Sequence, residues 1–203
     1  MLSGNEMINN FFNKYKLILE KTYKKRIANL ISPLCADNSH ILDVGCDDGG
    51  LSQMLIKKNH SLTIEGIDIQ GNRPAKISRK IYDGKKIPYK DKQFDITMAV
   101  DVLHHTRDIG SLLKEMKRVT KRYIIIKDHV SNDPLSFLLL SFMDWLANAP
   151  FGIRCIYNYP SLNKWYDHFN KLELRMESAS KTSGVPAIFF DNYNYIFELI
   201  RID

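Results

Sequence analysis

Histidine and aspartate side chains follow two apolar segments of this chain and could take part in proton transfer. They are Asp101, His104 and His105 after one segment, and Asp128 and His129 after the other. A histidine with a pKa near neutrality can deprotonate a hydroxyl group or hold an amine unprotonated. A lone histidine is more often structural, but two histidine-bearing loops at one sheet edge favour a functional role. We take His129 as the first candidate base and His104 or His105 as the second.

A glycine-bearing turn suited to a nucleotide-like cofactor follows the first apolar run, residues 41–44. Gly45, Gly49 and Gly50 let the backbone curl or approach a ligand closely. From residue 51 to 58 the apolar spacing becomes helical. The order of strand, turn and helix makes a ligand pocket at a helix N-terminus, although the pattern alone fits an ordinary connection equally well.

A second apolar run, residues 62–68, also ends in a carboxylate. Asp68 stands nineteen positions beyond Gly49, where an acid can accept both hydroxyls of a ribose. No strongly basic residue stands beside Asp68 to pair with a 2′-phosphate, and Arg73 is the nearest candidate. The pattern therefore disfavours NADP and leaves NAD and S-adenosylmethionine open.

The dipeptide Asp83-Gly84 could recognise an adenine ring. The Asp83 carboxylate can accept a hydrogen bond from the exocyclic amine, and the Gly84 amide can donate to a ring nitrogen. The same dipeptide is common in turns, so it indicates adenine recognition only together with the neighbouring motifs.

These segments resemble the class I S-adenosylmethionine-dependent methyltransferases, specifically a small bacterial type that is similar to methyltransferase type 11. The resemblance covers about residues 39–130. The family's acid-x-Gly-x-Gly-x-Gly motif falls on Asp43, Gly45, Asp47 and Gly49. The NAD fingerprint has no acid two residues before its first glycine, so Asp43 favours the methyltransferases. The family's adenine-contacting acid, fourth strand and following turn match residues 82–84, 93–96 and 101–105.

The resemblance implies S-adenosylmethionine as cofactor, with S-adenosylhomocysteine as product. Asp47 departs from the family, because it replaces a glycine where the backbone passes close to the cofactor. Aspartate tolerates the left-handed conformation, so we expect the turn to form with its carboxylate near the cofactor's ammonium group. A weakened or lost site is the alternative. The cofactor contacts that the resemblance implies are Asp43, Gly45, Asp47, Gly49, Asp68, Ile69, Asp83, Gly84 and Asp101.

The composition indicates one globular domain in a reducing compartment. The chain has 203 residues, of which 44% are hydrophobic, enough for a substantial core. Its first residues lack the charged start and apolar stretch of a signal peptide. Cys35, Cys46 and Cys155 are widely spaced and form no CxxC pair, which argues against a disulfide framework and a zinc site. We therefore expect a cytoplasmic protein without a metal.

The positive charge of the chain allows two interpretations. A net charge of +6 and a pI of about 9.1 suit a nucleic-acid partner, and basic residues cluster at 21–26 and 73–86. They are nevertheless mixed with acids, which favours a solvated surface. No added RNA-binding domain is present, and residues 99–102 lack an Asn-Pro-Pro-Tyr type motif. We expect a small-molecule substrate rather than a nucleic acid, and no transmembrane segment. The sequence gives no indication of the oligomeric state.

Alternating strands and helices predict an α/β fold, a Rossmann-like, doubly wound and mostly parallel sheet. As in the family, we expect seven strands with an antiparallel C-terminal strand. The chain should form a single domain, 1–203, made of an N-terminal helical cap at 1–38, a cofactor-binding half at 39–130, a helical insertion at 131–170 and closing strands at 171–203. Expected late elements are a strand at 122–127, helices at 109–119 and 160–169, and strands at 173–177, 187–190 and 195–200.

The segment 133–148 is the most individual part of the C-terminal third. Asp133 predicts an N-cap and Pro134 the first helical position. The segment is too short to span a bilayer, and Asp144 interrupts it. Because it is apolar on nearly all sides, it is either a buried helix or the wall of an apolar pocket, and we favour a lid over the acceptor site. Its apolar surface comes from Leu138, Leu139, Leu140, Phe142, Met143 and Trp145.

Together these observations predict an S-adenosylmethionine-dependent methyltransferase that acts at oxygen, nitrogen or carbon of a small, partly apolar metabolite. An RNA methyltransferase is one alternative. A catalytically weak cofactor-binding protein or subunit of the same fold is another, motivated by Asp47. The acceptor is not predicted, because the recognisable motifs lie in the cofactor half.

Overall fold

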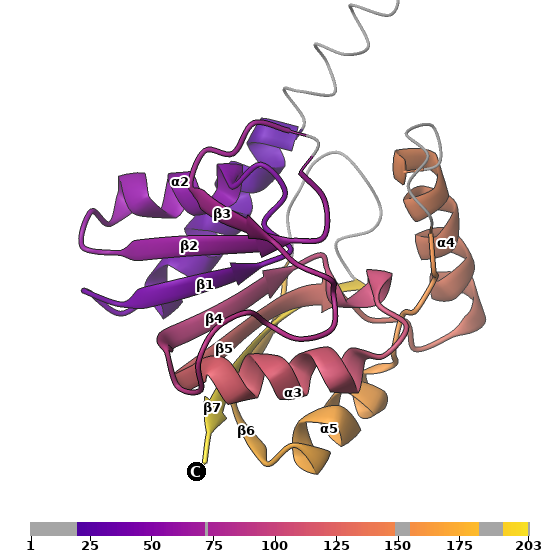
Figure 1. Ribbon diagram of the computed structural model, residues 1–203. Helices are drawn as coiled ribbons and strands as arrows, with labels where there is room; N and C mark the ends of the chain where they lie inside the picture. Colours follow the sequence, from indigo (N-terminus) through magenta and orange to yellow (C-terminus); the bar gives the residue numbers. More distant parts are fainter. Residues whose placement is uncertain (1–19, 72, 149–154, 183–192, 203) are drawn as a thin grey trace, which may run out of the picture.

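A seven-stranded sheet with helices on both faces forms the body of the protein (Figure 1). The computed structural model describes residues 20–71, 73–148, 155–182 and 193–202. Within them the strand order is β3-β2-β1-β4-β5-β7-β6. The strands are β1 (His40–Val44), β2 (Thr63–Asp68), β3 (Ser78–Ile81), β4 (Phe94–Val100), β5 (Thr120–His129), β6 (Leu174–Lys181) and β7 (Asn194–Arg201).

The pairing of the strands confirms the predicted fold class. The five strands β3, β2, β1, β4 and β5 run parallel, and β7 runs antiparallel to both β5 and β6. The strands expected at 173–177 and 195–200 correspond to β6 and β7, whereas the one expected at 187–190 lies outside the described residues. The carboxyl ends of the parallel strands meet at one edge, where α/β sheets bind ligands.

The edge strand β3 is the element that the sequence patterns did not reveal. Its residues, Ser-Arg-Lys-Ile, contain no apolar run, and of the four side chains only that of Arg79 is partly buried. An edge strand covered on little of its surface needs no continuous hydrophobic sequence. Its parallel pairing with β2 brings the segment that starts at Tyr82 beside the end of β2, because the Tyr82 N–H donates to the Asp68 carbonyl at 3.0 Å.

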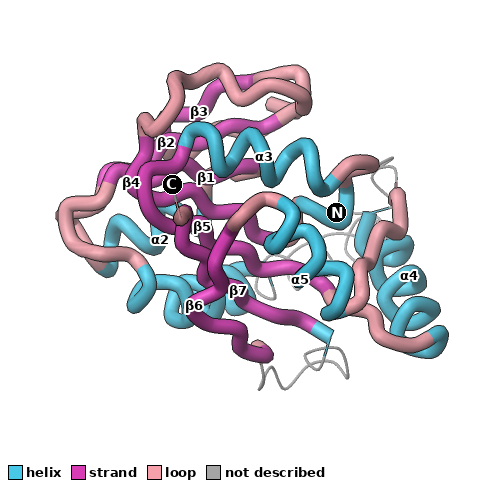
Figure 2. Tube along the Cα trace, turned by 90° about the horizontal axis from the view of Figure 1, so that it is seen from below, coloured by secondary structure: helices cyan, strands magenta, loops and turns pink. Residues whose placement is uncertain are grey.

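Helices cover both faces of the sheet (Figure 2). Two clusters of buried hydrophobic side chains attach them to these faces. Leu113 of α3 and Trp165 of α5 pack on one face, and Ile31 of the helix at 20–31 and Leu55 of α2 pack on the other. Successive side chains of a strand point to opposite faces of the sheet, so Ile124 and its neighbour Ile125 belong to different clusters. The helices are α2 (Gly50–Lys58), α3 (Ile109–Val119), α4 (Pro134–Asn148) and α5 (Leu162–Lys171), with short 3-10 turns η1 (Ser32–Leu34) and η2 (Leu103–His105).

Helix α4 is not the buried helix that was one of the two interpretations of its sequence, because most of its apolar side chains are exposed. Its N-cap is as predicted, since the Ser136 N–H donates to Asp133 Oδ1 at 2.9 Å. Leu140 is 3% exposed, but Leu138 is 65% exposed. The reason is position, because α4 lies beyond the carboxyl ends of the parallel strands, outside the two helical layers (Figure 1). Leu135, Phe137, Phe142, Trp145 and Leu146 are also exposed.

The length of α4 also bears on membrane insertion. It has 15 residues, fewer than the roughly 20 that a bilayer-spanning helix needs. Among the described ranges, we find no helix whose length and apolar character would allow it to cross a membrane.

Candidate functional site

Gly45 and Gly49 shape the turn after β1, and neither position has room for a side chain. Both have a positive φ, 73° and 70°, which glycine adopts without steric cost. A Cβ atom on Gly45 would lie 2.4 Å from Val102 Cγ2, and one on Gly49 would lie 2.5 Å from Ile77 Cγ1. The space that a side chain would need is filled by the protein's own residues. These glycines are thus required by packing as well as by backbone conformation.

Asp47 occupies the middle of the same turn in the left-handed conformation that was expected of it. Its φ is 49°, and its N–H donates to Asp68 Oδ2 at 2.8 Å. Its carboxylate is half exposed and contacts two cations, with 2.9 Å from Oδ2 to Arg73 Nη1 and 3.6 Å to Lys24 Nζ. The aspartate is therefore compatible with the turn, and the chain itself supplies counter-charges for it.

Asp43 lies buried just before the turn. The Ser52 hydroxyl donates to its Oδ2 at 2.6 Å. Burial raises the pKa of this carboxyl to about 7, while the hydrogen bond from Ser52 opposes the shift. A nearby cation would stabilise the ionised form of a carboxyl that is buried in this way.

Asp68 and Ile69 form the end of β2 beside this turn. The Asp68 carboxylate accepts one backbone N–H on each oxygen, from Asp47 at 2.8 Å and from Gln70 at 3.0 Å. Ile69 is 60% exposed, although it is apolar. Gly84, with φ 74°, lies against it, since a Cβ there would be 3.1 Å from Ile69 Cγ2. The strand end thus combines a carboxylate with an exposed apolar surface.

Asp83 forms the Asp-Gly turn that was the alternative interpretation of its sequence. Its Oδ1 accepts the N–H groups of Lys85 and Lys86 at 2.9 and 3.2 Å. These hydrogen bonds lower the pKa of the exposed carboxyl. A carboxylate can accept further bonds, so this turn does not preclude contact with adenine.

Asp48 is a residue of the turn that the sequence analysis passed over. Its carboxylate accepts the Gly50 N–H at 2.8 Å, at the start of α2, and binds Lys24 at 3.0 Å and Lys76 at 2.5 Å. Burial opposes ionisation, but the bonds from Lys76 and Lys24 prevail and hold its pKa well below the usual range. The position of an acidic residue just before a helix could have indicated this role from the sequence.

These contacts engage much of the basic cluster at 73–86. Arg73 and Lys76 form ion pairs with Asp47 and Asp48, and Arg79 donates to the carbonyl oxygens of Asp47 and Arg73. Basic side chains used in this way hold the turn in place. They are correspondingly less available to a nucleic-acid backbone.

Asp101 follows β4 and accepts hydrogen bonds from two residues that sequence reasoning missed. The Tyr23 hydroxyl and the Lys127 ammonium both donate to its carboxylate, and its φ is 56°. Lys127 is fully buried and also donates to Asn194 Oδ1 at 2.6 Å. Burial alone would raise the pKa of Asp101, but Lys127 lowers it. Tyr23 and Lys127 were hidden because each lies within a regular helix or strand pattern.

The three candidate histidines converge, as two histidine-bearing loops at one edge predicted. The ring of His104 lies 4.0 Å from that of His105 and 4.6 Å from that of His129. Nδ1 of His104 shares a 2.6 Å hydrogen bond with Asp128 Oδ1. The same carboxylate accepts the Leu103 N–H at 2.8 Å. Burial would lower the pKa of His104, but Asp128 raises it.

His129, the first candidate base, has a different environment from His104. The Trp165 indole donates to its carbonyl oxygen at 3.1 Å, and its Nε2 lies 4.0 Å from Asp101 Oδ1. Its Nδ1 is buried and finds no hydrogen-bond partner in the described part of the chain. Burial, assisted by His104 and Lys127, lowers its pKa to about 3. His129 is therefore a neutral imidazole and a weak base, and its catalytic role stays a prediction.

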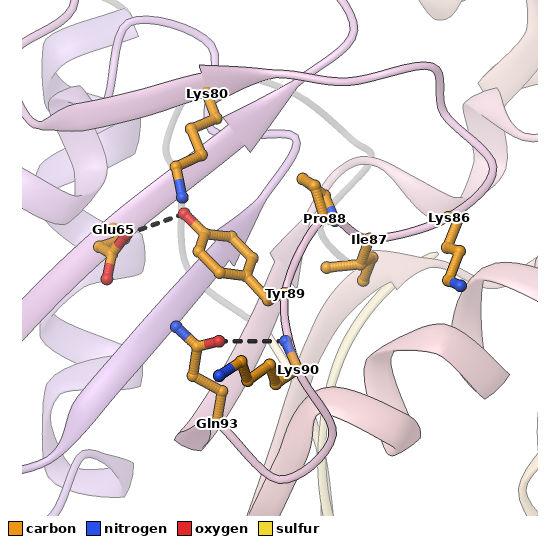
Figure 3. Close-up of a pocket in the computed structure, with 8 residues that line it drawn as sticks. All are labelled: Glu65, Lys80, Lys86, Ile87, Pro88, Tyr89, Lys90 and Gln93. Carbon is orange, nitrogen blue, oxygen red and sulfur yellow. Dashed lines mark hydrogen bonds between the residues drawn. The ribbon is translucent and has the colours of Figure 1, made fainter.

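A separate cavity of about 660 Å³ lies away from this edge (Figure 3). Its lining includes Glu65, which pairs with Leu42 in the middle of the sheet, and Tyr89, whose hydroxyl donates to Glu65 at 2.8 Å. Lys80 Nζ stands 4.1 Å from the centre of the Tyr89 ring. None of the site residues that the sequence predicted lines this cavity. We therefore look for function at the carboxyl edge.

Comparison with known proteins decides the family. A family described as "Methyltransferase domain" matches residues 15–174. The chain belongs to this methyltransferase family. Family and fold together imply S-adenosylmethionine as the cofactor, in agreement with the prediction.

Individual relatives of this methyltransferase chain have several different substrates in their names. Ajmaline N-methyltransferase of Rauvolfia serpentina is 32% identical over 109 residues, which cover 46% of this chain and 37% of that protein. The chain thus spans little more than a third of that protein's length. The ubiquinone/menaquinone biosynthesis C-methyltransferase UbiE of Rickettsia felis is 25% identical over 187 residues, covering 76% of this chain and 74% of that protein.

Solved structures support the same fold for the methyltransferase chain. A SAM-dependent methyltransferase from Methanosarcina mazei superposes with a TM-score of 0.64 at 16% identity. The match covers 85% of this chain and 96% of that one.

Proposed function

We propose that this methyltransferase chain transfers a methyl group from S-adenosylmethionine to a small, partly apolar metabolite. The observation that carries the proposal is the arrangement along one sheet edge. The turn with Asp43 and Asp68 lies at the ends of β1 and β2, and the cluster of His104 and His129 lies at the ends of the neighbouring β4 and β5. A cofactor side and an acceptor side thus adjoin.

The residues at β1 and β2 fit the cofactor chemically. Asp68 presents a carboxylate whose present donors are two backbone N–H groups, and the hydroxyls of a ribose are suitable additional donors. Ile69 and Gly84 offer an apolar surface for a base. Buried Asp43 would gain from a cationic ligand. When bound, S-adenosylmethionine supplies an activated methyl group, so the protein's main task is to align the acceptor.

The acceptor side supports a small molecule with an apolar part. His129 in its neutral form can accept a hydrogen bond from a hydroxyl or an amine of the acceptor and so orient it. The apolar side chains of α4 stand exposed beyond the same edge, as an apolar lid would require. One relative is named for N-methylation of ajmaline and the other for C-methylation in ubiquinone and menaquinone biosynthesis, which favours small acceptors here too.

Calorimetry with S-adenosylmethionine and S-adenosylhomocysteine tests the cofactor half of the proposal. Loss of a charge-assisted hydrogen bond costs about 1.5–3 kcal/mol, so Asp68→Ala should weaken binding about tenfold or more. Asp167→Ala, at an exposed position on α5, is the matched control and should bind like the wild type. Equal affinity of the wild type and Asp68→Ala would show that the cofactor does not bind here.

A screen of cell extract with radiolabelled S-adenosylmethionine tests the acceptor half. The labelled product is separated into small-molecule, lipid, protein and RNA fractions. Label in the small-molecule fraction, with a product that partitions into organic solvent, is the expected result. Label in RNA would establish the nucleic-acid alternative. Tight cofactor binding without any labelled product would favour a binding protein or subunit.

A further inference from the structure

Three side chains from separate segments come together beside the histidine cluster. His104 and His105 belong to η2, and Asp144 belongs to α4. Each offers one nitrogen or oxygen ligand atom, and these atoms lie within 4.8 Å of one another. This separation is close to what a shared metal ion requires, with small side-chain adjustments.

His104 is already oriented as a metal ligand would be. Its Nδ1 is committed to Asp128, so Nε2 is the nitrogen that remains for a ligand. A metal-bound histidine almost always bonds a carboxylate or carbonyl through its other nitrogen, which fixes the ring. Asp128 is itself held by the Leu103 N–H at 2.8 Å and the His129 N–H at 2.7 Å.

His105 carries a buried polar atom that the protein leaves unsatisfied. Its Nδ1 has no hydrogen-bond partner in the described part of the chain. Buried polar atoms of this kind are uncommon in folded proteins and call for an explanation such as an ion. A metal bound between His105 and His104 supplies one.

Asp144 is the third member, and its position on α4 is unusual. The residue is 9% exposed, on a helix whose apolar side chains largely face solvent. Tyr159 donates from its hydroxyl to Asp144 Oδ2 at 2.9 Å, which orients the carboxylate. A buried carboxylate is costly unless a cation or hydrogen bonds compensate it.

We propose that His104, His105 and Asp144 bind a divalent transition-metal ion, with Zn²⁺ as the expected ion. Two imidazoles and one carboxylate suit zinc, whereas Mg²⁺ and Ca²⁺ prefer oxygen ligands throughout. Three protein ligands leave a coordination position for water or another ligand. The ion links α4 to η2, and its binding does not require methyl transfer, so this site is independent of the proposed function.

A second acidic group serves as a contrast. Glu20, Asp47 and Asp48 also place oxygen atoms within 4.8 Å of one another. Lys24 and Arg73 already neutralise this group. We therefore expect Asp47→Asn to leave zinc binding unchanged.

Calorimetric titration of the untagged, chelator-treated chain with zinc chloride tests the proposal. The wild type should bind about one zinc ion per chain and bind magnesium at least tenfold more weakly. His105→Ala and Asp144→Asn should each weaken zinc binding at least tenfold. The matched controls His60→Ala and Asp167→Asn, both at exposed positions, should bind zinc like the wild type.

Two further measurements keep the result interpretable. Zinc should raise the midpoint of thermal unfolding of the wild type but not of Asp144→Asn, which keeps the size of the side chain and tests the site even if His105→Ala does not fold. The Cys155 thiol donates to the Asp144 carbonyl at 3.5 Å, so Cys155→Ser is included. No zinc binding by the wild type, or zinc lost in Cys155→Ser but retained in Asp144→Asn, would overturn the proposal.

Discussion

The proposed cofactor side and the proposed acceptor side of the sheet edge are built in different ways. The turn after β1 depends on backbone conformation within a few residues, with positive φ at Gly45, Asp47 and Gly49. The acceptor side depends on side chains from distant segments, such as the 2.6 Å bond between His104 and Asp128 and the 2.9 Å bond between Tyr159 and Asp144. Local residue types specify the first, whereas only the folded chain assembles the second.

This difference explains why the two sides tolerate change differently. A turn with left-handed residues and no spare volume depends on each glycine individually. Helix α4 buries only one line of side chains, so its packing in the fold depends only on the residues of that line. Substitutions on the two sides should therefore give unequal effects, and the following variants test that expectation.

The largest effect should come from Gly45→Ala in the turn. Positive φ costs a non-glycine residue about 1–2 kcal/mol, and forcing a Cβ to 2.4 Å from Val102 adds about 1–3 kcal/mol of overpacking. The free energy of unfolding should fall by about 2–5 kcal/mol in urea denaturation. Gly110→Ala, inside α3, is the control and should stabilise slightly or have no effect. Similar behaviour of the two variants would mean that the turn is more adaptable than its geometry indicates.

A paired comparison within α4 should give the next largest difference. Leu140→Ala removes a buried side chain and should cost about 2–3 kcal/mol of unfolding free energy. Leu138→Ala removes an exposed one and should change stability by less than about 0.5 kcal/mol. Thermal unfolding of both variants measures this. If α4 is a lid, Leu138→Ala should still weaken binding of an identified acceptor, and equal stability losses would show that α4 packs on both sides.

Asp43 should make stability depend on pH. Its folded-state pKa, about 7, exceeds the ordinary 3.8, so the folded chain holds the proton more tightly than the unfolded chain. The contribution of Asp43 to stability therefore decreases as pH rises between these values, by about 2 kcal/mol from about pH 5 to about pH 7. Urea unfolding of the wild type and Asp43→Asn over this range measures the difference. A wild type whose pH profile parallels that of Asp43→Asn contradicts the prediction.

The smallest effect should be that of Asp47→Gly on cofactor affinity. Asp47 already adopts the left-handed conformation and its carboxylate pairs with Arg73 and Lys24. Its replacement should change affinity by less than about tenfold, or 1.4 kcal/mol. Calorimetry with S-adenosylhomocysteine measures it. A wild type without measurable binding that Asp47→Gly restores would indicate a degenerate site.

Much of the parallel sheet was predictable because its signals are local. Apolar runs of four to seven residues indicated β1, β2 and β5, and the spacing in residues 109–119 gave the bounds of α3. β3 escaped because an edge strand buries little and needs no apolar run. For α4 the sequence predicted the cap and the length of the helix, but its apolar composition carried no information on which side the fold would cover.

The candidate site divides in the same way. Asp43, Gly45, Gly49 and Asp68 were recognisable from residue type and spacing, because a strand, a tight turn and a strand-end carboxylate are properties of short segments. The roles of the buried groups were not recognisable from the sequence. Tyr23 and Lys127, which donate hydrogen bonds to Asp101, lie 78 and 26 positions away from it along the chain. The grouping of His104 and His105 with Asp144 depends on where the fold places α4 relative to η2. Contacts between distant segments, and the burial that shifts the pKa values of their side chains, arise only when the chain has folded.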